Sequence, residues 1–157
     1  MLRFGVVVGV DEARGMVRVQ YTDMDGEVSY WLAVLKPKTL KDKAYWMPDI
    51  GEHVAVLIDE NAEEGVVLGA IYSSADSVPV ANRDKCHIKF EDGTWIEYDR
   101  AQHKLKAFVN GNVEITATGG CIIEGPVHII GNLEVAGNIH ATGAIIDEGG
   151  NTNHHSH

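Results

Sequence analysis

The sequence predicts an all-β protein with a small N-terminal barrel followed by a C-terminal β-helical array. Two observations predict it. Residues 1–72 contain five short apolar or alternating runs separated by turn residues, and no segment repeats its apolar residues with the 3.6-residue period of a helix. Further along, glycine recurs at every sixth position, at Gly119, Gly125, Gly131, Gly137, Gly143 and Gly149.

The five predicted strands of the N-terminal part are residues 2–10, 16–21, 28–35, 54–59 and 66–72. The turn sequences DEARG, DMDGE and NAEEG separate most of them, and a long connection with two prolines joins the third strand to the fourth. Five short strands with this long connection match an OB-fold barrel, and an SH3-like or other small barrel is the alternative. An OB-fold domain is therefore expected over residues 1–73.

A short linker and a second set of strands follow the predicted barrel. Residues 74–85 are small, polar and proline-containing, which is typical of a linker. Three further strands are predicted at residues 86–90, 94–98 and 105–109, because tight-turn sequences (EDG and DRAQ) separate alternating runs. The array with the six-residue period begins after these strands.

The array places its apolar residues on one side of an extended chain. Side chains of a strand alternate between two faces, so all odd-numbered residues share one face. The second and fourth residues after each glycine are odd-numbered: Cys121, Ile123, Val127, Ile129, Leu133, Val135, Ile139, Ala141, Ile145 and Asp147. Cys121 is therefore expected to be a buried free thiol, and neither it nor Cys86 has CxxC spacing.

A single copy of this array cannot bury its apolar row, because a lone strand has two open edges. A left-handed β-helix made by one chain is the first solution, but it needs about three hexads per coil, and five hexads complete fewer than two coils. Three chains wrapped around a threefold axis remove the edges by closed symmetry, with glycine at the bends. Residues 86–149 are thus predicted to form an intertwined, homotrimeric β-helix.

The odd-numbered row ends in possible metal ligands. Three inward Asp147 carboxylates would repel one another unless a hard cation such as Ca²⁺ lay between them; alternatively, the alternation slips at Gly149–Gly150 and Asp147 faces water. His155 and His157 of three chains would supply six imidazoles, an octahedral set that suits Fe²⁺ or Ni²⁺ better than Zn²⁺. Residues 150–157 are therefore expected to form a metal-binding apex. The alternative is a disordered tail that binds metals adventitiously.

The charge argues against a nucleic-acid partner. The formal net charge is -10, whereas phosphate binding needs a basic surface. Trp31, Tyr45 and Trp46 could form an aromatic platform for nucleotides or sugars, but acidic surroundings favour their packing in the barrel core or a subunit interface. The sequence shows no secretory signal and no apolar run of about 18 residues, so no membrane-spanning helix is expected.

Three segments resemble a known family. Residues 46–56 (WMPDIGEHVAV) and 65–73 (GVVLGAIYS) resemble conserved segments of baseplate assembly protein V, the central spike of contractile-tailed phages, and His155-Ser156-His157 resembles its H-x-H apex. The resemblance implies an OB-fold, an intertwined trimeric β-helix and iron held at the apex by two histidines of each chain. It also implies assembly in the host cytoplasm, a place at the baseplate tip of the virion, and contact of the OB-fold domain with hub or tail-tube proteins.

The function that the resemblance implies is mechanical. The spike would cap the tail tube and pierce the host outer membrane on contraction, with no catalysis required. The alternative is a hexapeptide-repeat acyltransferase-like enzyme with a catalytic histidine at a subunit groove, for which the candidates are His87, His103, His128 and His140. A sugar- or nucleic-acid-binding OB protein is a third possibility, which the acidic charge disfavours.

Overall fold

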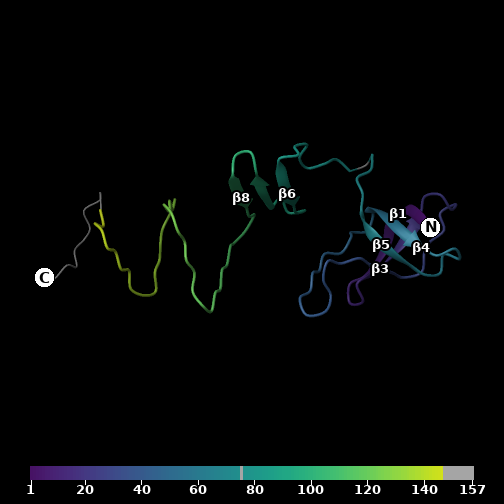
Figure 1. The fold of residues 1–157 in the computed structure, drawn as a ribbon, viewed down its shortest axis with the longest axis horizontal. Coiled ribbons are helices and arrows are strands. Elements are labelled where there is room, and N and C mark those ends of the chain that lie inside the picture. Colours follow the sequence, from purple (N-terminus) through teal and green to yellow (C-terminus); the bar gives the residue numbers. More distant parts are fainter. Residues whose placement is uncertain (75, 147–157) are drawn as a thin grey trace. The chain divides into compact units, whose positions relative to one another are not determined.

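The computed structural model describes residues 1–74 and 76–146 of the chain (Figure 1). It divides the chain into two units, Met1–Val113 and Glu114–His157. Within the part described, all strands lie in the first unit: β1 (Leu2–Asp11), β2 (Met16–Tyr21), β3 (Leu32–Val34), β4 (His53–Ile58), β5 (Gly65–Ala70), β6 (Lys85–Lys89), β7 (Trp95–Asp99) and β8 (Lys104–Phe108). Among these same residues, no helix has the length and apolar character needed to cross a membrane.

The first five strands close into a barrel in the order β1-β2-β3-β5-β4. Strand β1 pairs antiparallel with both β2 and β4, which closes the barrel, and β3 pairs parallel with β5. A five-stranded closed barrel fits the predicted OB-fold domain. The long connection between the third and fourth strands is also present, because 18 residues separate the end of β3 at Val34 from the start of β4 at His53.

The core of the barrel follows from the alternation within its strands. In β2, Val17, Val19 and Tyr21 are buried while Arg18 and Gln20 are exposed. The buried hydrophobic residues of the described chain are Val7, Val17, Val19, Tyr21, Leu32, Val54, Val56, Ile58 and Val67. All of them belong to β1–β5, so the barrel has a complete apolar core of its own.

Strand β1 approaches β2 so closely that residue 5 must be glycine. A Cβ atom on Gly5 would lie 2.5 Å from the backbone oxygen of Gln20 and 2.5 Å from Val19 Cγ1. Gly5 pairs with Tyr21 on one side and with Val54 on the other. The missing side chain therefore lets β2 close on β1.

The third strand is shorter than predicted. Residues 28–35 were expected to be extended, but β3 covers only Leu32–Val34, preceded by an isolated bridge between Gln20 and Val28. Ser29 is buried, and its Oγ accepts a hydrogen bond from the Val19 N–H at 2.9 Å. Since a side chain satisfies this donor of β2, the regular ladder is interrupted, and the predicted length was wrong.

Strands β6, β7 and β8 form an antiparallel sheet in sequence order. The predicted strands at 86–90, 94–98 and 105–109 are thus confirmed, each displaced by one residue at both ends. A set of three residues paired side by side, one from each strand, is here called a rung. One set of rungs is Cys86–Tyr98–Leu105 and Ile88–Ile96–Ala107, and the set on the opposite face includes His87–Glu97–Lys106.

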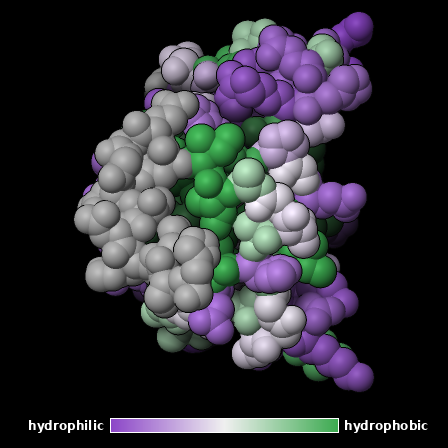
Figure 2. Space-filling model, turned by 90° about the vertical axis from the view of Figure 1, so that its left-hand side faces the viewer, coloured by the Kyte–Doolittle hydropathy of each residue, from purple (hydrophilic) through white to green (hydrophobic). Residues whose placement is uncertain are grey.

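The described residues after β8 lack regular strands and are exposed. Every side chain from Val109 to Ile146 is exposed, and Ile123, Leu133 and Ile139 of the predicted inward row keep about two thirds or more of their surface open. Figure 2 shows hydrophobic surface left open between hydrophilic groups. Cys121 is also exposed, so its predicted burial is wrong for one copy of the chain.

Candidate functional site

The predicted metal ligands lie outside the described residues. Asp147, His155 and His157 all fall within the segment 147–157. Among residues 1–74 and 76–146, no group of three or more histidine, cysteine, aspartate or glutamate side chains is arranged to hold a metal ion. The apex with iron and the axial Ca²⁺ site therefore stay predictions from the sequence.

The four histidines considered for catalysis lie in different segments of the chain. His87 is in β6, and His103 is in the β7–β8 turn with a φ of 52°. His128 and His140 are exposed residues of the segment after Val113. Of the four, His87 lies closest to a carboxylate, that of Glu97.

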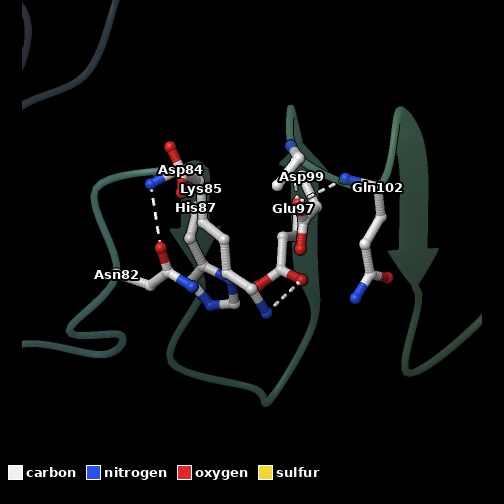
Figure 3. Close-up of polar contacts among 8 residues, drawn as sticks. Asn82, Asp84, Lys85, His87, Glu97, Asp99 and Gln102 are labelled. Carbon is white, nitrogen blue, oxygen red and sulfur yellow. Dashed lines mark hydrogen bonds and ion pairs between the residues drawn. The ribbon is translucent and has the colours of Figure 1, made fainter.

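Glu97 is the centre of a polar cluster on the β6–β8 sheet (Figure 3). Its side chain is 9% exposed; Oε1 accepts a hydrogen bond from Lys85 Nζ at 2.9 Å, and Oε2 lies 3.0 Å from His87 Nδ1. Strand pairing explains these contacts, because His87 is directly opposite Glu97. Cys86, the neighbouring thiol, belongs to the opposite set of rungs, so the Glu97–His87 pair has no thiol nucleophile beside it. Lys85, His87 and Glu97 thus form a polar cluster around one buried carboxylate.

The charges of this cluster stabilise each other. The hydrogen bond from Lys85 lowers the pKa of Glu97 below its ordinary 4.5, against the opposing effect of burial. The same hydrogen bond raises the pKa of Lys85 above its ordinary 10.5. Both shifts favour the charged pair at neutral pH, so the cluster holds β6 against β7 by a charge-assisted hydrogen bond.

Asp99 closes the end of the same face. It is 7% exposed, and its Oδ1 accepts hydrogen bonds from the backbone N–H groups of Ala101 and Gln102, both at 3.0 Å. Figure 3 shows the contact between Asp99 and Gln102 beside the Glu97 cluster. Arg100 also reaches back to Asp84 at 2.7 Å, ahead of β6. Side chains therefore fix the β7–β8 turn and the start of the sheet.

The loop of residues 36–50, here called the basic loop, is the second candidate surface. It contains four lysines within eight residues of an acidic chain, and Leu40, Tyr45 and Trp46 are 82%, 65% and 64% exposed. The Lys36 ammonium lies 5.9 Å from the centre of the Tyr45 ring and donates to the backbone oxygen of Trp46. Burial lowers the pKa of Lys36. The loop thus offers apolar and cationic groups together.

The three aromatic residues considered as a binding platform are not part of the barrel core. Trp31 is 38% exposed, and Tyr45 and Trp46 are more open. The expectation that they pack inside the barrel is therefore wrong, while a subunit interface stays a prediction. Trp31 lies close to Gly9 of β1, where a Cβ atom would come 3.7 Å from its ring, whereas Tyr45 and Trp46 belong to the basic loop.

Comparison with known proteins agrees with this architecture. Residues 3–72 match the family model described as the Type VI secretion system/phage-baseplate injector OB domain, and this range coincides with β1–β5. A spike protein of Escherichia phage P2 is 30% identical over 131 residues, which is 83% of this chain. The chain is thus similar to a baseplate spike protein over most of its length, and its barrel is similar to the injector OB domains.

The match covers only part of the relative, since the chain spans 61% of the length of the phage P2 spike protein. A place in the tail baseplate of a virion, predicted from the sequence, is supported by both comparisons. Neither comparison supports the hexapeptide acyltransferase alternative.

Replacement of Glu97 by Gln tests the polar cluster. The folded-state pKa of Glu97 lies below 4.5, so its stabilisation is present above that pH and is lost as the pH falls through the folded-state value. We expect Glu97→Gln to lower the denaturant midpoint at pH 7 and to approach the wild type in acid, once the pH lies below the lowered folded-state pKa and the carboxylate is protonated in both states. Urea unfolding followed by circular dichroism measures this difference.

The control for this experiment is Glu91→Gln. Glu91 is an exposed carboxylate in the β6–β7 turn, so its replacement should leave the midpoint unchanged at both pH values. Equal effects of the two variants at pH 7, or a Glu97→Gln deficit that does not shrink as the pH is lowered from 7 into the acid range, would contradict the role assigned to the cluster.

Proposed function

We propose that the protein is the structural central spike of a contractile phage tail or a tail-like particle, and that three copies form it. The main support is the segment with glycine at every sixth position. Its odd-numbered apolar side chains are exposed in a single chain. An apolar row this long needs partners, and identical chains around a threefold axis supply them without leaving an open edge. The similarity to the spike protein of Escherichia phage P2 supports the same proposal.

The proposed spike works mechanically. It caps the tail tube and is driven through the host outer membrane when the sheath contracts. Interwound chains suit this task, because the backbone groups of each copy pair with its neighbours and a load along the axis is shared by three strands. The proposal assigns no catalytic step to the chain.

The OB-fold domain is proposed to contact the baseplate hub or the tail tube through the basic loop. The match of residues 3–72 to injector OB domains supports a baseplate partner for the barrel. Lys41 and Lys43 carry exposed positive charge next to the exposed Leu40 and Tyr45 side chains. Such a surface fits an acidic protein surface with an apolar recess.

The apex is proposed to hold one iron ion between three chains. This proposal depends on the sequence alone: His155 and His157 have the same parity as the apolar row, and six imidazoles suit an octahedral ion. Asp147, at the same parity, is proposed to bind Ca²⁺ on the axis. A metal there would tie three chain ends together where fraying is otherwise easiest.

Multi-angle light scattering tests the trimer. The expected mass is about three times the chain mass of 17.1 kDa. Two neighbouring substitutions sharpen the test: Ile129→Asp places a charge in the odd-numbered row and should dissociate the trimer, whereas Ile130→Asp lies on the other parity and should leave it intact. A wild-type protein that stays a monomer, or equal effects of both substitutions, would overturn the proposal.

Elemental analysis after exhaustive dialysis tests the apex. We expect about one iron per three chains, because one octahedral ion uses the six imidazoles of three chains. The double variant His155→Ala, His157→Ala should lose the iron, while His154→Ala, at the even position beside them, should retain it. Calcium that disappears in Asp147→Asn would support the second site. The apex is refuted if the wild type retains no iron, or if the double variant retains as much.

Charge reversal tests the basic loop. In cells that produce the tail particle, we expect Lys41→Glu, Lys43→Glu to reduce co-sedimentation of the spike with tails, because both charges lie on the proposed docking loop. The control, Glu60→Lys, Glu63→Lys, changes two exposed charges in the β4–β5 turn, at the opposite end of β4. If the Lys41→Glu, Lys43→Glu variant forms a trimer and is incorporated into tails as well as the wild type, the loop is excluded as the docking surface.

A further inference from the structure

The chain contains one Asn-Gly dipeptide, at Asn110 and Gly111, just after the end of β8 at Phe108. It lies where the β6–β8 sheet ends and the segment that leads to the glycine-rich array begins. The last pair of β7 with β8 is Trp95–Phe108, so Asn110 lies beyond the backbone ladder of the sheet. Other contacts therefore hold the chain at this junction.

The turn between β6 and β7 holds Asn110 in place. The backbone N–H of Asn110 donates to Thr94 Oγ1 at 3.1 Å, and its side-chain Nδ2 donates to the backbone oxygen of Asp92 at 3.0 Å. These two hydrogen bonds are here called the clamp. Their partners are themselves fixed, because Thr94 donates its N–H to Asp92 Oδ1 at 2.8 Å and its hydroxyl to Asp92 Oδ2 at 3.0 Å.

The residue that follows the clamp leaves the side chain of Asn110 open to attack from the backbone. Gly111 is exposed, and a Cβ atom placed on it would meet nothing within 4 Å. Asn110 is exposed as well. The Gly111 nitrogen thus lies next to a side-chain amide with no side chain of its own in the way, and glycine gives the backbone the freedom that a closer approach needs.

We propose that Asn110 is a site of spontaneous deamidation and that the clamp controls the rate. The Gly111 nitrogen attacks Asn110 Cγ, which closes a succinimide ring. The Cγ–Nδ2 bond breaks, and the proton of the Gly111 N–H ends on the departing nitrogen, which leaves as ammonia. Water then opens the ring at either carbonyl group, giving aspartate or isoaspartate, in which the main chain runs through the side-chain carbon.

The clamp opposes this reaction in the folded chain. While Nδ2 is bonded to the Asp92 oxygen and the backbone N–H to Thr94, the Asn110 side chain is directed at the turn. Its Cγ atom meets the Gly111 nitrogen only after the side chain has left that bond. The reaction therefore proceeds through a locally open state, and the population of that state sets the rate.

The products do not fit the clamp. An ionised carboxylate accepts hydrogen bonds and cannot donate them, so an acidic residue at position 110 would face the Asp92 backbone oxygen with a second acceptor. Isoaspartate also lengthens the main chain just ahead of the array, whose faces depend on strict alternation. Deamidation thus releases the junction between the sheet and the array. This inference goes beyond the proposed spike and does not depend on the number of chains in it.

Peptide mapping by mass spectrometry tests the site in the full chain. The protein is kept in mildly alkaline buffer, natively and in urea, and the aspartate and isoaspartate forms of each asparagine are followed over time. We expect Asn110 to react more than about tenfold faster in urea, because both hydrogen bonds of the clamp are lost there. Asn112 is the internal control: the branched side chain of Val113 follows it and hinders attack, so Asn112 should stay intact.

Two substitutions at Thr94 separate the clamp from other effects of folding. Thr94→Val removes the hydroxyl that accepts the Asn110 N–H, and should raise the native rate about fivefold, the effect of one hydrogen bond on the open population. Thr94→Ser keeps a hydroxyl at this position and should react at the wild-type rate. Circular dichroism shows whether each variant is folded.

Two further substitutions test what the product does to the junction, and they do not require the reaction itself. Asn110→Asp replaces the Nδ2 donor by an oxygen and should accelerate amide hydrogen exchange at residue 110. Asn112→Asp introduces the same charge two residues further on and should leave that exchange unchanged.

Three results would overturn the inference. The first is that Asn110 survives in urea as long as Asn112, which removes the site. The second is equal reaction rates in the native and unfolded chain, or in Thr94→Val and Thr94→Ser, which removes the control by the clamp. The third is equal exchange in Asn110→Asp and Asn112→Asp, which removes the effect on the junction.

Discussion

An extended chain with a single apolar row cannot bury that row by itself, and this constraint governs the C-terminal third of the protein. The described residues after Phe108 are exposed, aliphatic side chains included. In water each of these side chains would gain free energy from a cover, at about 25 cal/mol per Å² of buried apolar area. In the proposed trimer the cover comes from other copies, and assembly and folding of this region would then be one process.

Dependence on partners increases along the chain. The barrel closes on itself and buries nine apolar side chains, so its stability is its own. The β6–β8 sheet is intermediate, with one face satisfied by Glu97, Lys85 and Asp99 and the other left open. The array after it has one row of apolar residues and no core. This gradient agrees with the proposed trimer, because the part of the chain without a core of its own is the part assigned to contacts between copies.

His87 illustrates how a chemically suggestive residue can have a structural role. As an isolated histidine near a glycine-rich array, it was a candidate for acyl transfer. The structure places it opposite Glu97, where Lys85 shares the same carboxylate and Trp95 stacks on the ring. Because the pairing of β6 with β7 brings these four side chains to one face, their assembly follows from the register of the sheet.

The sequence by itself determined the features that depend on neighbouring residues in the chain. Strand alternation located most of the barrel strands and all three strands of the second sheet, and the six-residue glycine period located the array. These signals are local, because the two faces of a strand are set by the backbone alone.

The tertiary structure decided what depends on contacts distant in sequence. The short β3 follows from the Ser29 hydroxyl meeting the Val19 N–H, and the burial of Glu97 follows from its position opposite His87. The exposure of Trp31, Tyr45 and Trp46 was likewise missed, since an aromatic side chain has the same identity in a core and on a surface. Which residue lies across the next strand is set by register and closure of the sheet, and neither is written in any one segment of the chain.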